Sequence, residues 1–80
     1  MFENREKEVY NVYLNGESVG FFQGDTWGDA QRKCAGFYNE SRDKEDRLSW
    51  DKFYALWVNP KHYEQLGITF EEDKEVEKES

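Results

Sequence analysis

The 80-residue sequence contains only one cysteine, one histidine and one proline. A single cysteine, Cys34, excludes an intramolecular disulfide and a cysteine-ligated metal cluster. The single histidine, His62, has no serine or cysteine placed to act with it as a nucleophile, and no second nitrogen or sulfur ligand to help it hold a metal. We therefore expect no catalytic residues, no metal, no cofactor and no enzymatic activity.

Long apolar runs are missing as well. No stretch is long enough to span a membrane, and no signal-peptide core is present. This composition predicts a protein with no membrane partner, located in the cytoplasm. The glycines at positions 16, 20 and 24 fall at a turn, within a strand and at a strand end, so they do not form a phosphate-binding loop.

Basic patches are scarce, although charge is abundant. The formal net charge is −7, and residues 71–80 hold six acids against two lysines. Residues 9–70 hold nine acids against seven bases, and their cations alternate with acids between positions 32 and 47. Direct nucleic-acid binding requires a concentrated basic patch, so we expect none. The acidic segment 71–80 is expected to be a disordered tail.

Aromatic residues are plentiful, with three tryptophans, five tyrosines and six phenylalanines. Each ring can bury roughly 150–250 Å², which helps to fill the core of a chain this small. We expect a single domain over residues 1–80, with a folded core at about 9–70.

A β-hairpin is predicted at residues 9–23. Residues 10–14 and 18–22 are rich in β-branched and aromatic side chains, and Asn15-Gly16 between them suits a type I′ turn. A two-residue loop would pair Val12 with Val19. In that register, Tyr13 and Phe22 lie on one face of the sheet, opposite the face that a helix would cover.

An amphipathic helix is predicted over Trp27–Asn39. Thr26 is a good N-cap, with Asp29 three residues further on. The apolar side chains recur at helical spacing and should face the sheet, whereas Gln31 should point outward. These apolar positions are Trp27, Ala30, Cys34, Phe37 and Tyr38. The charged segment 40–47 that follows is either a loop or an extension of the helix.

The next segment, 48–59, fits two structures. It could form a helix with an aromatic stripe or a strand buried on both faces, and the strand is favoured because a hairpin alone is marginally stable. Asn59-Pro60 should begin a short second helix that ends before Gly67. The predicted fold class is therefore α+β, with a three-stranded antiparallel sheet (ββαβ), one main helix on one face and a short second helix.

The run YNVYLNGESVGFFQGDTWGDAQRKC, from Tyr10 to Cys34, resembles a hairpin-then-helix domain of short phage-encoded proteins. The likeness covers about residues 9–38. The small size and acidity also resemble phage inhibitors of host defence or of host nucleic-acid enzymes, some of which mimic DNA. The resemblance implies a viral inhibitor that acts in the host cytoplasm.

The hypothesis for function is a non-enzymatic protein-binding module that inhibits or modulates a host protein with a basic surface. The alternative is a structural or assembly protein that self-associates, for example as a homodimer, through its aromatic sheet face. Residues 60–66 and 68–70 either cover that face or leave it exposed. The predicted partner-binding residues are aromatic residues of this face together with acids, namely Tyr13, Phe22, Glu17, Asp51, Glu40, Asp43, Glu45, Asp46, Glu71, Glu72 and Asp73.

Overall fold

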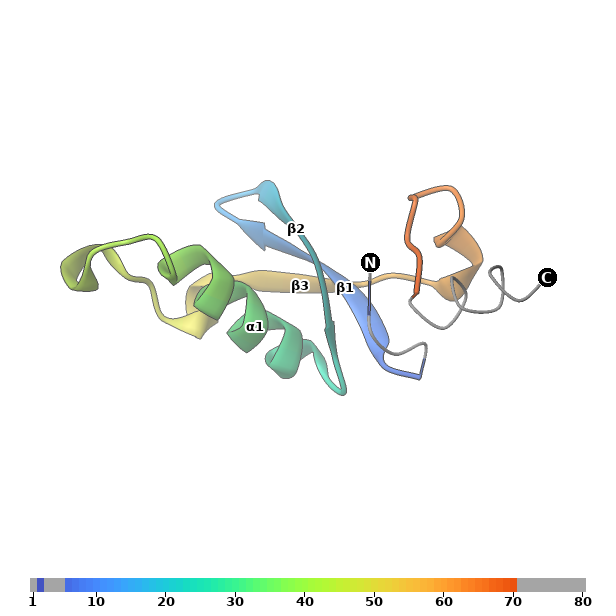
Figure 1. Ribbon diagram of the computed structural model, residues 1–80, viewed down its shortest axis with the longest axis horizontal. Coiled ribbons are helices and arrows are strands. Elements are labelled where there is room, and N and C mark those ends of the chain that lie inside the picture. Colours follow the sequence, from blue (N-terminus) through green and yellow to red (C-terminus); the bar gives the residue numbers. More distant parts are fainter. Residues whose placement is uncertain (1, 3–5, 71–80) are drawn as a thin grey trace.

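The computed structural model describes residue 2 and residues 6–70. The elements follow in the order β1 (Glu8–Leu14), β2 (Glu17–Gly24), α1 (Trp27–Asn39), η1 (Lys44–Asp46), η2 (Trp50–Lys52), β3 (Tyr54–Trp57) and η3 (Pro60–His62), where η denotes a 3-10 turn. The strands form one antiparallel sheet in the order β2-β1-β3, and α1 lies across one face (Figure 1). The α+β class is confirmed. The expected disordered tail lies outside the described residues.

The hairpin turn forms where the sequence predicts it. Asn15 and Gly16 both have positive φ, at 53° and 84°, as a type I′ turn requires. Next to the turn, Leu14 pairs with Glu17 and Tyr13 pairs with Ser18, in the expected register.

Beyond these pairs the predicted register is wrong. The ladder shifts between Val12 and Tyr13, so Val12 pairs with Gly20 and Tyr10 pairs with Phe22. Val19 is the extra residue of a β-bulge, and Gly20 accommodates the bulge with a φ of +149°, which side-chain-bearing residues rarely adopt. Because side chains alternate between faces, the shift moves Phe22 to the face covered by α1.

Helix α1 has the predicted bounds but a different buried face. The Thr26 hydroxyl accepts a hydrogen bond from the Asp29 amide at 3.2 Å and caps the helix. The residues that face the sheet are Ala30, Gln31, Cys34 and Ala35, whereas Trp27 and Phe37 remain 59% and 61% exposed. Small side chains let the helix approach the strands closely, and the larger rings are left at its margins. Trp27 and Phe37 were therefore wrongly assigned to the buried stripe.

Gln31 is also buried, although its position in the sequence predicts an outward side chain. Its Nε2 donates a hydrogen bond to the carbonyl oxygen of Phe53, just before β3. This bond joins α1 to the chain that enters the third strand. The bond also supplies a donor for the buried carbonyl oxygen of Phe53, as buried polar groups require.

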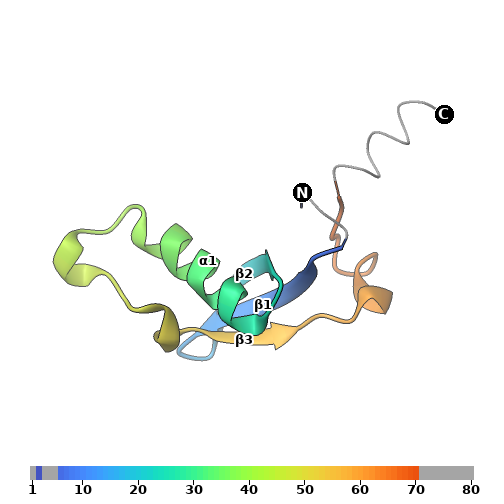
Figure 2. The same cartoon turned by 90° about the horizontal axis from the view of Figure 1, so that it is seen from below.

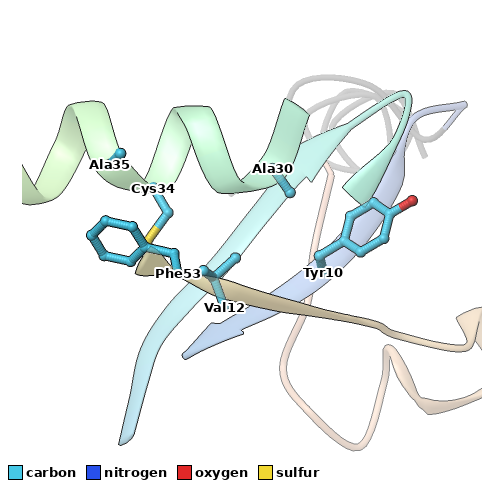
Figure 3. Packing of buried hydrophobic residues seen from close by; sticks show 6 residues of the cluster. All are labelled: Tyr10, Val12, Ala30, Cys34, Ala35 and Phe53. Carbon is cyan, nitrogen blue, oxygen red and sulfur yellow. The ribbon is translucent and has the colours of Figure 1, made fainter. Parts of the chain in front are cut away.

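The main core lies between α1 and the sheet. Val12, Cys34 and Phe53 are almost completely buried there, with Tyr10, Ala30 and Ala35 around them (Figure 3). The ring of Tyr38 meets that of Phe53 edge-on, with 5.4 Å between their centroids. Aromatic pairs in this geometry are stabilised beyond their buried area.

The ambiguous segment contains a strand, as favoured, but only over Tyr54–Trp57, and this strand is mostly exposed rather than buried on both faces. β3 pairs antiparallel with β1, from Tyr13 opposite Tyr54 to Tyr10 opposite Trp57. The charged connector before it is a loop that contains η1. Its ends are held together because the Asn39 amide both donates to and accepts from the backbone of Leu48, at 2.8 and 2.9 Å.

A second apolar cluster forms from the C-terminal segment. Asn59 caps the turn by accepting from the Lys61 amide at 3.0 Å, and Gly67 turns the chain back with a φ of +72°. The second helix is thus shorter than predicted, a 3-10 turn at Pro60–His62. The returning segment places buried residues against the sheet face opposite α1, namely Ile68 and Phe70 with Val9 and Val58.

Burial should make the only thiol unreactive. Cys34 is fully buried, and desolvation raises its pKa to about 11, so the reactive thiolate is scarce at neutral pH. We expect iodoacetamide at pH 8 to alkylate the native protein about 100-fold more slowly than the urea-unfolded chain. Mass spectrometry over a time course measures both rates. Equal rates would show that α1 opens readily to solvent.

Candidate functional site

The sheet face opposite α1 is only partly covered. The C-terminal segment packs over its Val9 and Val58 end, whereas the end nearer the hairpin turn carries Asn11, Tyr13 and the outer strand β3. The two alternatives predicted from the sequence were a covered face and an exposed face. The structure has the first at the Val9 end and the second at the end nearer the hairpin turn. Tyr54 and Leu56 of β3 are 62% and 44% exposed, and Leu66 after η3 is 47% exposed.

An open groove runs between this face and the turn after η3. Its volume is about 510 Å³. Apolar and aromatic side chains from three parts of the chain line most of it, and neutral amides and an imidazole supply the polar atoms. The groove residues include Tyr13, Phe21, Leu56, His62, Gln65 and Leu66.

A short hydrogen-bond chain holds Tyr13 in the groove. The Ser18 hydroxyl donates to Asn11 Oδ1 at 2.6 Å, and Asn11 Nδ2 donates to the Tyr13 hydroxyl oxygen at 3.0 Å. These bonds join β2 to β1 and orient the phenol ring before any partner binds. A side chain that is already ordered loses less conformational entropy on binding.

One border of the groove is also held in place, because His62 Nδ1 lies 3.3 Å from Gln65 Oε1. Trp57 also lines the groove, but it pairs with Tyr10, so its half-exposed indole lies toward the face covered by α1. There the indole Nε1 donates to the Glu8 carboxylate on the neighbouring strand.

The predicted site residues fall in separate places. Tyr13 lines the groove, as expected of the open face. Phe22 does not, because the bulge turns it toward α1, where its ring centroid lies 5.8 Å from that of Phe37. Its assignment to the exposed face is wrong.

The acidic residues do not surround the groove. Glu17 pairs with Leu14 beside the hairpin turn, and Asp51 lies in η2. The loop after α1 carries four exposed acids at the end of the molecule away from η3 (Figure 1), namely Glu40, Asp43, Glu45 and Asp46. Glu71, Glu72 and Asp73 lie outside the described residues.

The predicted partner-binding residues did not include the groove residues that come from β3, from η3 and from the turn after it. Leu56, Leu66, His62 and Gln65 become neighbours only because the C-terminal segment folds back. One usable signal was present, because residues 53–60 form an eight-residue run without charge. Residues 9–16, which include most of β1, form a second uncharged run of the same length.

Few titratable side chains line the groove, namely those of Tyr13 and His62. Among the described residues, no group of three or more His, Cys, Asp or Glu side chains is arranged to hold a metal ion. On the other face, burial raises the pKa of Tyr10, and the carboxylates of Glu8 and Asp29 add to that effect. Within the same part of the chain, no helix has the length and apolarity needed to cross a membrane.

In comparisons with known proteins, no family model, no curated protein and no solved structure matches this chain.

Proposed function

We propose that the protein is a non-enzymatic protein-binding module whose binding surface is the groove on the open sheet face. The observation that carries the proposal is the exposure of Tyr54, Leu56 and Leu66 around an ordered Tyr13. Large contiguous apolar patches are rare on the surfaces of soluble proteins, and where they occur they commonly mark interaction sites. Tyrosine and tryptophan are also the residues on which binding energy concentrates.

The partner class in this proposal is a host protein with a basic surface. Two features support it, the net charge of −7 and the resemblance of residues 9–38 to short phage-encoded proteins. Since the predicted partner-binding acids that the structure describes lie away from the groove, they would act at long range by steering a basic partner, while the groove supplies the close contacts. The chain would then be a phage-type inhibitor or modulator that acts in the host cytoplasm.

Substituting Leu66 with serine tests the binding surface. Leu66 is half exposed, so L66S should cost less than about 1 kcal/mol of folding free energy. Losing an apolar anchor should nevertheless weaken partner binding at least tenfold. Capture from host lysate with the wild-type protein identifies the partner, and calorimetric titration of the purified pair measures the affinity.

The matched control is Trp27→Ala, which removes a ring that is 59% exposed from α1, on the other side of the sheet. W27A should bind the partner as the wild type does. Equal binding by L66S and the wild type, or a greater loss in W27A, would contradict the groove as the binding surface.

A further inference from the structure

The two edges of the sheet differ in how they are protected. Edge strands expose backbone amides and carbonyls that can pair with another chain, and proteins commonly block them with bulges or charges. β2 begins at Glu17 and contains the bulge at Val19. β3 has neither, and it lies in the uncharged run 53–60. In Figure 2, β3 runs along the lower border of the molecule.

The backbone groups that β3 leaves free can be assigned. The Val58 amide donates to the Val9 carbonyl at 2.9 Å, so Val58 and Val9 form a hydrogen-bonded pair. Such pairs alternate along an antiparallel ladder. Leu56 and Tyr54 therefore direct their amides and carbonyls toward β1, whereas Ala55 and Trp57 direct theirs away from the sheet.

We propose that β3 pairs antiparallel with β3 of a second copy of this chain, around a two-fold axis at Leu56. In this register, the outward groups of Ala55 meet those of the second copy's Trp57, and each pair exchanges both backbone hydrogen bonds. A C2 interface uses the same surface on both subunits, so one strand must complement itself. The outward groups of β3 satisfy this condition because they lie symmetrically about Leu56.

Side chains also match across the axis. On the face covered by α1, the small Ala55 lies opposite the half-exposed indole of the second copy's Trp57. On the open face, Leu56 meets Leu56 of the second copy, and Tyr54 lies opposite Val58. No like charges face each other, because residues 53–60 carry none.

This self-complementarity favours a second copy over an unrelated strand as the occupant. The resulting dimer has one continuous sheet, with both α1 helices on one side and both grooves on the other. Leu56 links the two grooves at the axis. The inference does not depend on the proposed function, because the dimer forms from the chain alone.

A disulfide cross-link tests the register. Residues opposite each other in a non-hydrogen-bonded pair have Cα atoms about 4.5 Å apart, within the roughly 4.4–6.8 Å range of disulfides. Leu56→Cys should therefore give a covalent dimer rapidly under mild oxidation. Tyr54→Cys is the matched control on the same face, because the two copies of residue 54 would lie about 13 Å apart. Cys34 is buried in both variants and contributes no background.

A second variant tests the edge without covalent chemistry. Ala55→Pro removes an amide that points away from β1, so the β1–β3 ladder is kept and the circular dichroism spectrum should not change. Analytical ultracentrifugation over a concentration series should show a dimer for the wild type and a monomer for A55P. A wild type that stays monomeric into the millimolar range, or a Tyr54→Cys variant that cross-links as fast as Leu56→Cys, would overturn the proposal.

Discussion

Replacing Phe53 with alanine is expected to lower the free energy of unfolding by about 3–5 kcal/mol. The Phe53 side chain is 2% exposed, and it fills the space between β3, α1 and the edge of the Tyr38 ring. Removing the ring leaves a cavity that the surrounding backbone cannot close, since the Phe53 carbonyl is held by Gln31. A domain of this size has little stability in reserve, so F53A should be largely unfolded at 37 °C.

Urea denaturation followed by far-ultraviolet circular dichroism measures the loss. Trp27→Ala is the control because it removes a larger ring that is mostly exposed. Its cost should stay under about 1 kcal/mol. Equal costs for F53A and W27A would mean that α1 packs with a different face than the one described.

Gly24→Ala is expected to be the second most damaging change, with a loss of about 1–3 kcal/mol or more. A Cβ atom at Gly24 would lie 2.7 Å from Asp29 Cβ, 2.8 Å from the Ala30 amide nitrogen and 3.0 Å from the Thr26 carbonyl oxygen. Two of these atoms belong to the backbone of the first helical turn. The chain can relieve the clash only by moving α1 away from the end of β2.

Gly36→Ala provides the contrast. Gly36 lies in α1, and a Cβ atom there would meet no atom within 4 Å. Alanine has the higher helix propensity, so G36A should raise stability by about 0.5–1 kcal/mol. Thermal unfolding of both variants gives the comparison. A neutral G24A would show that the turn between β2 and α1 is looser than the structure describes.

Local sequence signals predicted the elements well. Asn15-Gly16 set the turn, Thr26 set the start of α1, and Asn59-Pro60 set the turn that follows β3. Each of these signals acts within a few residues, so neighbouring residues alone determine the outcome. The preference for a strand within residues 48–59 followed from the need for a third strand to stabilise the hairpin.

Errors arose where distant contacts decide the structure. The bulge at Val19 shifts the pairing of β2 with β1, and the one local signal for it is Gly20, because a glycine within a strand often marks a bulge. The exposure of Trp27 follows from the preference of the helix for small side chains against the sheet. The groove needs the segment after β3 to lie beside the open sheet face, and that fold-back is one of two alternatives that the sequence allows, because no local signal decides it.

The second cluster also joins residues from near both ends of the chain. Phe2 donates its amide to the Thr69 carbonyl at 2.9 Å, and its ring centroid lies 6.0 Å from that of Phe70. During synthesis on the ribosome, the hairpin and α1 can form from contiguous residues, whereas this cluster must wait until position 70 has emerged. The contact between Phe2 and Phe70 closes a loop of about 70 residues, which costs more conformational entropy than the local contacts of the hairpin. We therefore expect this cluster to form last and to open first. Hydrogen exchange should thus be faster at the amide of Phe70 than at the amide of Val12.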